Sequence, residues 1–278
     1  MKKLAFLLPL LLASCGSDDP GKGSVAFTTW GEEFIEKEIP ASAFEDGWSV
    51  HYDKFLLSIR AITVAEGTSV AAKQSGAILF DMTRPGVKPI ASFADLEAKN
   101  WTTVNFQIGP ASADATLGPG VTEADRGLLG TASLRAQGSA TKGAVTKKFD
   151  WTFTKPTLFD ECRGEKDGRE VIGALVTDGG TDTMQITIHG DHLFYDDLQA
   201  ENAKLRFTAI ANADADSDGI VTQAELDKVR LTTIPKADGG YGTGSAASVD
   251  TLGAFVSALA RTVGHFRGEG ECFAKDPR

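Results

Sequence analysis

Alternation of polar and apolar residues along the first two thirds of the chain predicts β-strands. Residues 103–108 read Thr-Val-Asn-Phe-Gln-Ile, and residues 148–153 alternate in the same way. A period of two turns one set of side chains inward and the other toward solvent. Such short strands with Gly, Pro and Asp between them predict a mainly β fold, an antiparallel β-sandwich-like domain. Further strands are predicted at 24–30, 48–64, 77–80, 171–176 and 184–189, the last two paired across the turn at 178–182.

The periodicity changes in the last third of the chain, where three helices are predicted. The clearest covers residues 250–265, with apolar residues recurring at steps of three and four and so forming one stripe. Asp250 is its expected N-cap and Gly264 its expected stop. Two shorter helices are predicted at 196–212 and 222–230. The stripe consists of Leu252, Phe255, Val256, Leu259, Val263 and Phe266.

The predicted elements divide the chain into a β-rich domain followed by a C-terminal helical section. Residues 24–195 form the β-rich domain and 196–230 a helix–loop–helix. Residues 231–278 form a Gly-rich linker and a last helix that we expect to pack on the β domain.

The first residues resemble the export signal of bacterial lipoproteins. A basic start is followed by an apolar run at 4–13, which is too short to span a bilayer. Residues 12–15 (Leu-Ala-Ser-Cys) resemble the lipobox. The resemblance implies that 1–14 is removed, that Cys15 is acylated, for instance with palmitate, and that 15–23 is a flexible tether. Gly16 after the cysteine favours the outer membrane of a Gram-negative cell envelope; the alternative is an ordinary secretory signal with a chance cysteine.

The charge balance limits the partners that the protein can have. The chain has 278 residues, with 28 Lys and Arg against 38 Asp and Glu, a net charge of −10. Loss of Lys2 and Lys3 with the signal takes this to −12. No nucleic acid is expected as a partner, because phosphates need a basic patch. The membrane is expected as a partner through the lipid, while any protein or small-molecule partner stays unassigned.

Two cysteines remain after Cys15. Cys162 and Cys272 form an even pair in an oxidising compartment, where a disulfide is the default state. In the chain-entropy model a loop of this length stabilises the fold by roughly 4–5 kcal/mol. The alternative makes both thiolates metal ligands, although neither belongs to a Cys-x-x-Cys pair.

Residues 214–225 match the calcium-binding loop of the EF-hand family at all twelve positions. Calcium takes six to eight oxygen ligands, and an EF-hand supplies them from fixed positions of the loop. Gly219 permits the sharp turn at the sixth position, and Val221 is the apolar residue at the eighth. The alternative is an acidic surface turn. The expected ligands are Asp214, Asp216, Asp218, the carbonyl of Ile220, Thr222 directly or through water, and Glu225.

The calcium loop has no second copy in the sequence. EF-hands usually occur in pairs, and a dockerin would also need two loops. A single loop outside the cytosol is expected to bind calcium with a dissociation constant on the order of 10⁻⁴–10⁻³ M. We therefore expect it to stabilise the fold and not to act as a signalling switch.

Three of the four histidines are candidates for a second metal site. His189 and His192 are three residues apart, and His265 follows the predicted last helix. If they met in space they would form a site for copper or zinc, with Asp191 as a fourth ligand or its support. The alternative is that these are ordinary hydrogen-bonded or exposed histidines. With His189 and His192, the segment 262–272 resembles uncharacterised exported lipoproteins and, more distantly, methanobactin-associated periplasmic copper-binding proteins.

No sequence motif argues for an enzyme. The chain lacks a Gly-x-Ser-x-Gly elbow, a Walker loop, a Gly-x-Gly-x-x-Gly turn and His-Glu-x-x-His. The first hypothesis is a lipid-anchored cell-envelope protein that binds calcium for structural stability. The second is a periplasmic copper- or zinc-binding protein or metallochaperone that uses the histidines, and a hydrolase with an unidentified site is the third.

Overall fold

The computed structural model describes residues 20–246 and 248–277. The expected signal peptide and Cys15 lie outside the described residues. Within the described ranges, no helix has the length and apolar character needed to cross a membrane.

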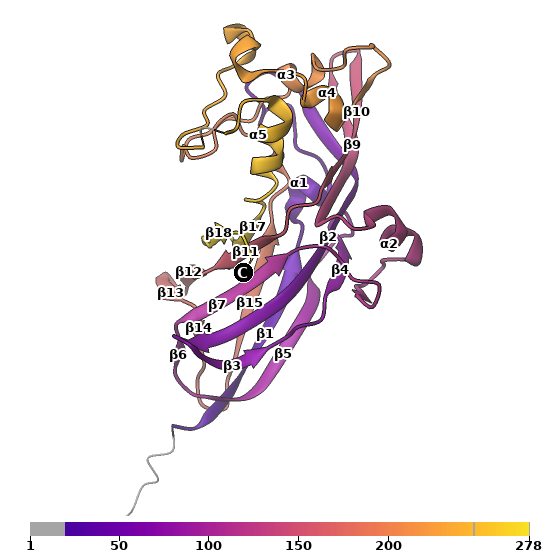
Figure 1. The fold of residues 1–278 in the computed structure, drawn as a ribbon. Helices are drawn as coiled ribbons and strands as arrows, with labels where there is room; N and C mark the ends of the chain where they lie inside the picture. The colour runs from indigo at the N-terminus through magenta and orange to yellow at the C-terminus, as the bar shows by residue number, and fades with distance from the viewer. Residues whose placement is uncertain (1–19, 247, 278) are drawn as a thin grey trace, which may run out of the picture.

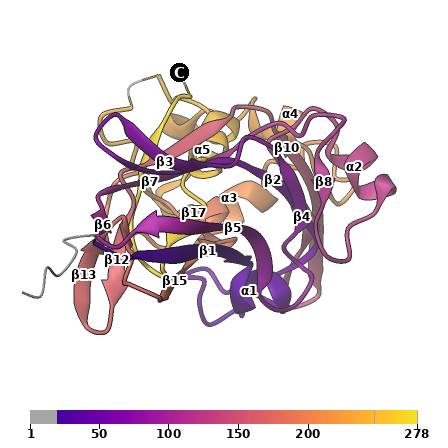
Figure 2. The ribbon, with the colours of Figure 1, turned by 90° about the horizontal axis from the view of Figure 1, so that it is seen from below.

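Two curled sheets face each other and enclose the core (Figures 1 and 2). Together they form a sandwich that is open like a half-barrel. The smaller sheet has four strands in the order β17-β15-β1-β5. Every second residue of β1 is buried, as the alternation of its sequence requires. The strands are β17 (Gly264–Phe266), β15 (Thr181–Ile188), β1 (Lys22–Trp30) and β5 (Lys88–Glu97).

The larger sheet has ten strands and is organised around β2 (Ser49–Glu66), the longest strand. Its main path runs β16-β10-β9-β2-β7-β11-β18, while β3 and β4 pair with β2, and β8 with β4. The other strands are β16 (Ile220–Val221), β10 (Val145–Phe153), β9 (Leu134–Lys142), β7 (Thr103–Ile108), β11 (Thr157–Asp160), β18 (Phe273–Lys275), β3 (Ser69–Lys73), β4 (Ile78–Asp81) and β8 (Thr116–Leu117).

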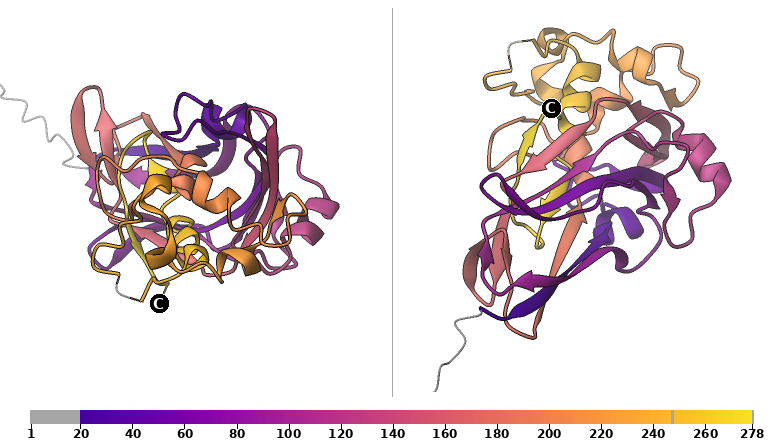
Figure 3. Two further views of the ribbon diagram at one scale, coloured as in Figure 1. Left: turned by 90° about the horizontal axis from the view of Figure 1, so that it is seen from above. Right: turned by 60° about the horizontal axis from the view of Figure 1, so that its bottom comes forward.

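Helices α3, α4 and α5 gather at one end of the sandwich, opposite the end at which β1 begins (Figures 1 and 3). Two small two-stranded sheets, β12–β13 and β14–β6, lie near the start of β1. Their bounds are β12 (Arg163–Lys166), β13 (Arg169–Ile172), β14 (Ala174–Leu175) and β6 (Asn100–Trp101). The helices are α1 (Glu32–Glu36), α2 (Glu123–Leu129), α3 (Thr208–Ala211), α4 (Gln223–Leu226) and α5 (Leu252–Leu259), with 3₁₀ turns η1 (Asp191–Phe194), η2 (Leu231–Thr233) and η3 (Lys236–Asp238).

An aromatic cluster joins the helical end to the larger sheet. Tyr52 and Trp151 of the sheet pack with Phe194 and Phe207, which come from the segment between β15 and α3. The indole of Trp151 donates a hydrogen bond to the carbonyl of Val221, 2.9 Å away. Because these groups are fully or almost fully buried, the helical end shares one core with the β domain.

The mainly β fold predicted from the sequence is confirmed, but the sheets also contain parallel strand pairs, whereas the sequence predicted an antiparallel arrangement. β1 pairs in parallel with β15, and β10 with β16. The predicted pairing of 171–176 with 184–189 is wrong. Gly173 (φ +73°) interrupts the first segment, and a Cβ there would lie 2.0 Å from the Trp101 carbonyl oxygen. β13 therefore pairs with β12, β14 with β6, and β15 lies between β1 and β17.

Two of the predicted helices are largely wrong, and the third is shorter than predicted. Most of 196–212 is irregular because the carboxylates of Asp196 and Asp197 accept backbone N–H groups that a helix would use. The segment predicted as a helix at 222–230 holds only the turn α4. In the last helix Thr251, and not Asp250, is the N-cap, accepting a hydrogen bond from the amide of Ala254.

The chain turns back into strand structure after α5. The end of the predicted helix, including His265, lies in β17, which pairs with β15. At the other end, β1 already begins at Lys22, inside the stretch expected to be tether. Strands β5 and β9 were not predicted, since β9 is rich in Ala, Gly and Ser, which have little strand preference.

A disulfide joins Cys162 and Cys272, as the sequence predicts. It links the start of β12 to the segment between β17 and β18. The thiolate-ligand alternative is therefore ruled out, because both sulfur atoms are in the disulfide.

Candidate metal centre

Three neighbouring elements bring His189, His192 and His265 together. His189 directly follows β15, His192 lies in η1, and His265 is the middle residue of β17. The pairing of β17 with β15 sets His265 opposite Thr187, and the amide of His189 donates to the carbonyl of Val263 at 2.9 Å. The ring centroids are 4.2 Å apart for His189 and His265, 4.9 Å for His192 and His265, and 5.4 Å for His189 and His192. We call these three residues the histidine cluster.

His189 and His265 are buried and His192 is half-buried, yet two buried nitrogens of the histidine cluster have no hydrogen-bond partner among the described residues. His189 is 5% exposed and His265 7% exposed. Nε2 of His189 and Nδ1 of His265 are the unpaired atoms. A buried polar group without a partner costs about 1–3 kcal/mol, so such groups in a native protein call for an explanation.

The third imidazole has its tautomer fixed by its neighbour. Nδ1 of His192 lies 2.8 Å from the hydroxyl oxygen of Thr262, and that hydroxyl donates its own proton to the carbonyl of Leu259. The imidazole must therefore donate from Nδ1, which leaves a lone pair on Nε2. Metal-binding histidines are commonly held by such a second hydrogen bond.

Carboxylates complete two overlapping groups that could hold a metal ion. Ligand atoms of His189, Asp191 and His192 lie within 4.8 Å of one another, and the same holds for His189, His265 and Glu269. His189 belongs to both groups. Asp191, the fourth ligand or support expected from the sequence, is 8% exposed and accepts a hydrogen bond from Tyr195.

Glu32 and Glu269 were not identified from the sequence. Oε1 of Glu32, from the first turn of α1, lies 3.4 Å from Nε2 of His189, within ion-pair distance but not placed to form a hydrogen bond with it. No sequence signal connects Glu32 to histidines more than 150 positions later, because only the placement of α1 beside β15 brings them together. Glu269 was easier to suspect, since it lies four residues after His265 in the run Glu-Gly-Glu.

Burial keeps the imidazoles in the form that binds metal. It lowers the pKa of His189 to about 4, with His265 as the second cause. Burial and the two neighbouring histidines also hold the pKa of His192 far below its ordinary value. The imidazoles of His189 and His192 are therefore neutral at pH 7, and only neutral imidazole coordinates a metal.

Burial has the opposite effect on the neighbouring carboxyl groups, because it raises their pKa values. Burial, followed by the charges of Glu269 and Asp191, raises the pKa of Glu32 to about 7. Burial also raises the pKa of Asp191 above its usual value. Three carboxyl groups are thus crowded beside buried imidazoles, and a cation among them would relieve their repulsion.

The segment that carries His265 and Glu269 is fixed by several contacts. Arg267 donates to Asp182 at 2.6 Å, and Asp182 also accepts from Lys166. The hydroxyl of Thr187 donates to the carbonyl of Gly268 at 2.7 Å. With the disulfide at Cys272, these contacts hold the segment against β15.

His51 is not part of the histidine cluster. It lies exposed on β2, and its Nδ1 is 2.8 Å from the carbonyl of Lys37.

The predicted calcium loop places three of its expected ligands together. Ligand oxygens of Asp214, Asp216 and Asp218 lie within 4.8 Å of one another. The amide of Gly219 (φ +86°) donates to Asp214 at 3.0 Å, and the amide of Ile220 donates to Asp218 at 2.7 Å. Val221, the expected apolar anchor, is fully buried in β16, which pairs with β10.

The remaining expected ligands have other contacts. Thr222 is the N-cap of α4, and Glu225 accepts hydrogen bonds from the amide and hydroxyl of Thr222 and from the amide of Ala215. The ammonium group of Lys147 contacts one oxygen of Asp214, whereas the other oxygen is buried without a partner in the described chain. The flanking helices are single turns, α3 and α4. Calcium binding by this loop stays a prediction.

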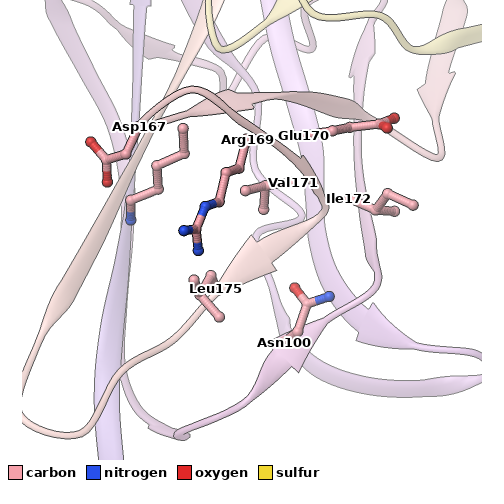
Figure 4. A pocket seen from close by; sticks show the side chains of 8 residues that line it. Asn100, Asp167, Arg169, Glu170, Val171, Ile172 and Leu175 are labelled. Carbon is pink, nitrogen blue, oxygen red and sulfur yellow. The ribbon is translucent and has the colours of Figure 1, made fainter.

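A separate cavity of about 590 Å³ lies between the hairpin β12–β13 and strand β14 (Figure 4). Arg169, Val171 and Leu175 line it, together with Asn100 from β6. Its lining includes no histidine or cysteine and only two carboxylates, Asp167 and Glu170, so it offers no cluster of metal ligands.

Comparison of the sequence with protein-family models finds no match, and comparison with curated proteins also finds none. Among solved structures, MbnP from Methylosinus trichosporium is similar over 62% of this chain and 77% of its own, with 9% sequence identity and a TM-score of 0.33. A likeness this slight carries no argument about fold or function.

Proposed function

We propose that the protein binds a transition-metal ion, copper(II) or zinc, at the histidine cluster. The observation that carries the proposal is the convergence of His189, His192 and His265, with unpaired nitrogens on two buried rings. A bound ion supplies the missing partners, and Glu269 and Asp191 supply negative charge beside it. We therefore prefer transition-metal binding to the first hypothesis from the sequence, a protein that binds only calcium.

The available donor atoms favour a divalent ion over copper(I). Imidazole nitrogen suits zinc and copper, and carboxylate oxygen is a hard ligand, whereas copper(I) prefers thiolate or thioether sulfur. The cysteines at 162 and 272 are in the disulfide. Because His189 and His192 are already neutral at pH 7, metal binding there does not have to displace protons from them.

Metal analysis of histidine variants tests the proposal. The purified chain is loaded with copper(II) or zinc, dialysed against a weak chelator and analysed for bound metal. We expect one equivalent in the wild type, and loss of it in His189→Ala and His265→Ala. His51→Ala is the matched control, because its ring lies exposed and outside the cluster. A wild type without metal, or a folded His189→Ala/His265→Ala double variant that retains one equivalent, would contradict the proposal.

Calcium binding by residues 214–225 is a second candidate function. It is favoured by the grouping of Asp214, Asp216 and Asp218 and by the buried, unpaired oxygen of Asp214. We propose that calcium stabilises the fold at this loop. The melting temperature of the purified chain should rise in millimolar calcium relative to chelator, and an unchanged melt would count against it.

We also propose that the chain is exported and held to the outer membrane of a cell envelope by a lipid on Cys15. The support is the lipobox-like stretch 12–15, together with the disulfide, which forms in oxidising compartments. Cys15→Ser should move the protein from the membrane to the soluble fraction. Incorporation of labelled palmitate into that variant would contradict the assignment of the lipid.

A further inference from the structure

A second cavity opens directly beside the histidine cluster. It has a volume of about 460 Å³, and His192 and His265 form part of its lining. Four carboxylate residues line it as well: Asp197, Glu201, Glu269 and Glu271. We call this the acidic cavity. No lysine or arginine lines it.

None of the four carboxylates of the acidic cavity is held in an ion pair within the described chain, although Arg163 and Arg267 line the adjoining cavity that shares Glu269 and Glu271. Buried Asp182, by contrast, has both Lys166 and Arg267 beside it. Like charges that line a concave surface focus their field into it and raise the local concentration of counter-ions.

The buried imidazole of His265 shows that the acidic cavity is more than an acidic surface. His265 lines the cavity while only 7% exposed, and its Nδ1 has no hydrogen-bond partner in the described structure. A polar group held in this state at the end of a charged opening points to a ligand that arrives through that opening. His189 does not line the cavity, so the imidazoles of His192 and His265 are the first that an entering ion meets.

We propose that the acidic cavity is the entry route for the metal, which arrives as a hydrated divalent cation and not as an anionic chelate. This inference rests on the proposed function of the histidine cluster. Glu201 and Glu271 act at a distance, by attracting the cation, while Glu269 is close enough to His189 and His265 to become a ligand. The same field repels a metal that is wrapped in a negatively charged chelator.

The test compares rates of metal uptake. Hydrated cobalt(II) is mixed with the metal-free chain, and its absorption bands are followed in a stopped-flow instrument. The double variant Glu201→Gln/Glu271→Gln should take up the ion about tenfold more slowly at low ionic strength. The difference should vanish near 1 M salt, where the screening length is about 3 Å. The final spectrum should match that of the wild type, because neither residue is a ligand.

A matched control removes the same charge elsewhere. Glu38→Gln/Asp95→Asn neutralises two exposed carboxylates, one between α1 and β2 and one on β5, that form no ion pair in the described chain and lie outside the lining of the acidic cavity. Its uptake rate should stay within twofold of the wild type. A second arm supplies cobalt(II) as its anionic nitrilotriacetate complex. Direct uptake from that complex should be slow, and it should be no faster in the wild type than in Glu201→Gln/Glu271→Gln.

Each outcome decides between the two proposals. Equal slowing in both double variants, or a salt-independent rate in the wild type, would overturn the entry route while leaving metal binding intact. Uptake from the anionic complex as rapid as from the hydrated ion would do the same. Absence of any cobalt binding by the wild type would overturn the proposed function itself, and the entry route with it.

Discussion

The calcium loop and the histidine cluster are built in opposite ways. The calcium loop takes its candidate ligands from twelve consecutive residues, 214–225, and its hydrogen bonds run largely within that stretch. The residues of the histidine cluster come from η1, β17 and the end of β15, and the neighbouring carboxyl group of Glu32 comes from α1, near the other end of the chain. A local site depends on turn chemistry, whereas a distributed site depends on the whole fold.

The two regions also differ in how their polar groups are satisfied. Asp216 and Asp218 are exposed, and backbone N–H groups of the loop hydrogen-bond to their carboxylates. His189 and His265 are buried and each keeps an unpaired nitrogen in the described structure. We therefore expect weak, rapidly exchanging calcium binding at the loop, and tighter, more selective binding at the histidine cluster.

Loss of the disulfide should have the largest effect. Cys162→Ser/Cys272→Ser removes a cross-link over a sequence separation of 110 residues, so the free energy of unfolding should fall by about 4 kcal/mol. The segment with His265 and Glu269 loses its anchor, so metal affinity should fall by about tenfold or more, measured by competition with a chelator. Calcium affinity of the loop should change less than twofold. Equal losses of affinity at both regions would show that the calcium loop depends on the fold as much as the histidine cluster does.

Removal of Arg267 should cause the next largest loss in the free energy of unfolding. Arg267→Ala leaves the buried carboxylate of Asp182 with Lys166 alone, and urea unfolding should show a loss of about 3 kcal/mol. Arg267→Lys should recover part of this. Metal affinity should fall with Arg267→Ala, because Arg267 lies between His265 and Glu269. An unchanged unfolding midpoint would show that Lys166 suffices.

The ion pairs of Asp182 with Arg267 and Lys166 predict how the stability of the metal-free protein changes in acid. Burial alone would raise the pKa of Asp182, but hydrogen bonds from Arg267 and Lys166 outweigh it and hold that pKa below its usual value. The unfolded chain then binds a proton that the folded chain does not. The stabilisation is present above the unfolded pKa of about 3.9 and is lost as pH falls through the lower folded pKa. Acid unfolding of Arg267→Ala should accordingly begin at higher pH than that of the wild type.

Thr262→Val should act on the histidine cluster alone. It removes the acceptor for Nδ1 of His192, so the ring loses the contact that fixes its tautomer. Metal affinity should fall about tenfold, as for other groups that orient a metal-binding histidine. Thr262→Ser is the control that keeps the hydroxyl. If both variants bind metal as tightly as the wild type, His192 is not a ligand.

Calcium should stabilise the fold by less than the changes above destabilise it, and its effect should be confined to the calcium loop. At 10 mM calcium and a dissociation constant of about 1 mM, binding stabilises the fold by about 1.4 kcal/mol. Asp214→Asn should abolish this gain without changing metal uptake by the histidine cluster. A calcium response that survives in Asp214→Asn would place calcium elsewhere on the molecule.

Lys147→Met should have the smallest effect, and in the opposite direction. The ammonium group of Lys147 contacts Asp214 and competes with a cation there. Its removal should tighten calcium binding a few-fold, measured by calorimetry. A weaker affinity in Lys147→Met would mean that this contact holds Asp214 in place for calcium.

The strands were predictable where their pattern is local and strong. Thr103–Ile108 alternates in sequence and is a strand with alternating burial, and the long run through 48–64 is one continuous strand. Prediction failed at 196–212, because carboxylates of Asp196 and Asp197 capture backbone amides in a loop. It failed again at the end of the helix predicted over 250–265, because α5 stops at Leu259 and Gly264–Phe266 pairs with β15.

The mainly β class, the disulfide between Cys162 and Cys272, and the spacing of the acidic residues at 214–225 could all be predicted from the residues alone. Each of these follows from residues whose spacing or compartment chemistry is written in the chain. The folded chain was needed to show that His189, His192 and His265 meet, that Glu32 and Glu269 lie beside them, and that an acidic cavity opens next to them. The reason is physical: these contacts depend on the parallel pairing of β1 with β15 and the return of the chain into β17, which are set by burial across the whole core.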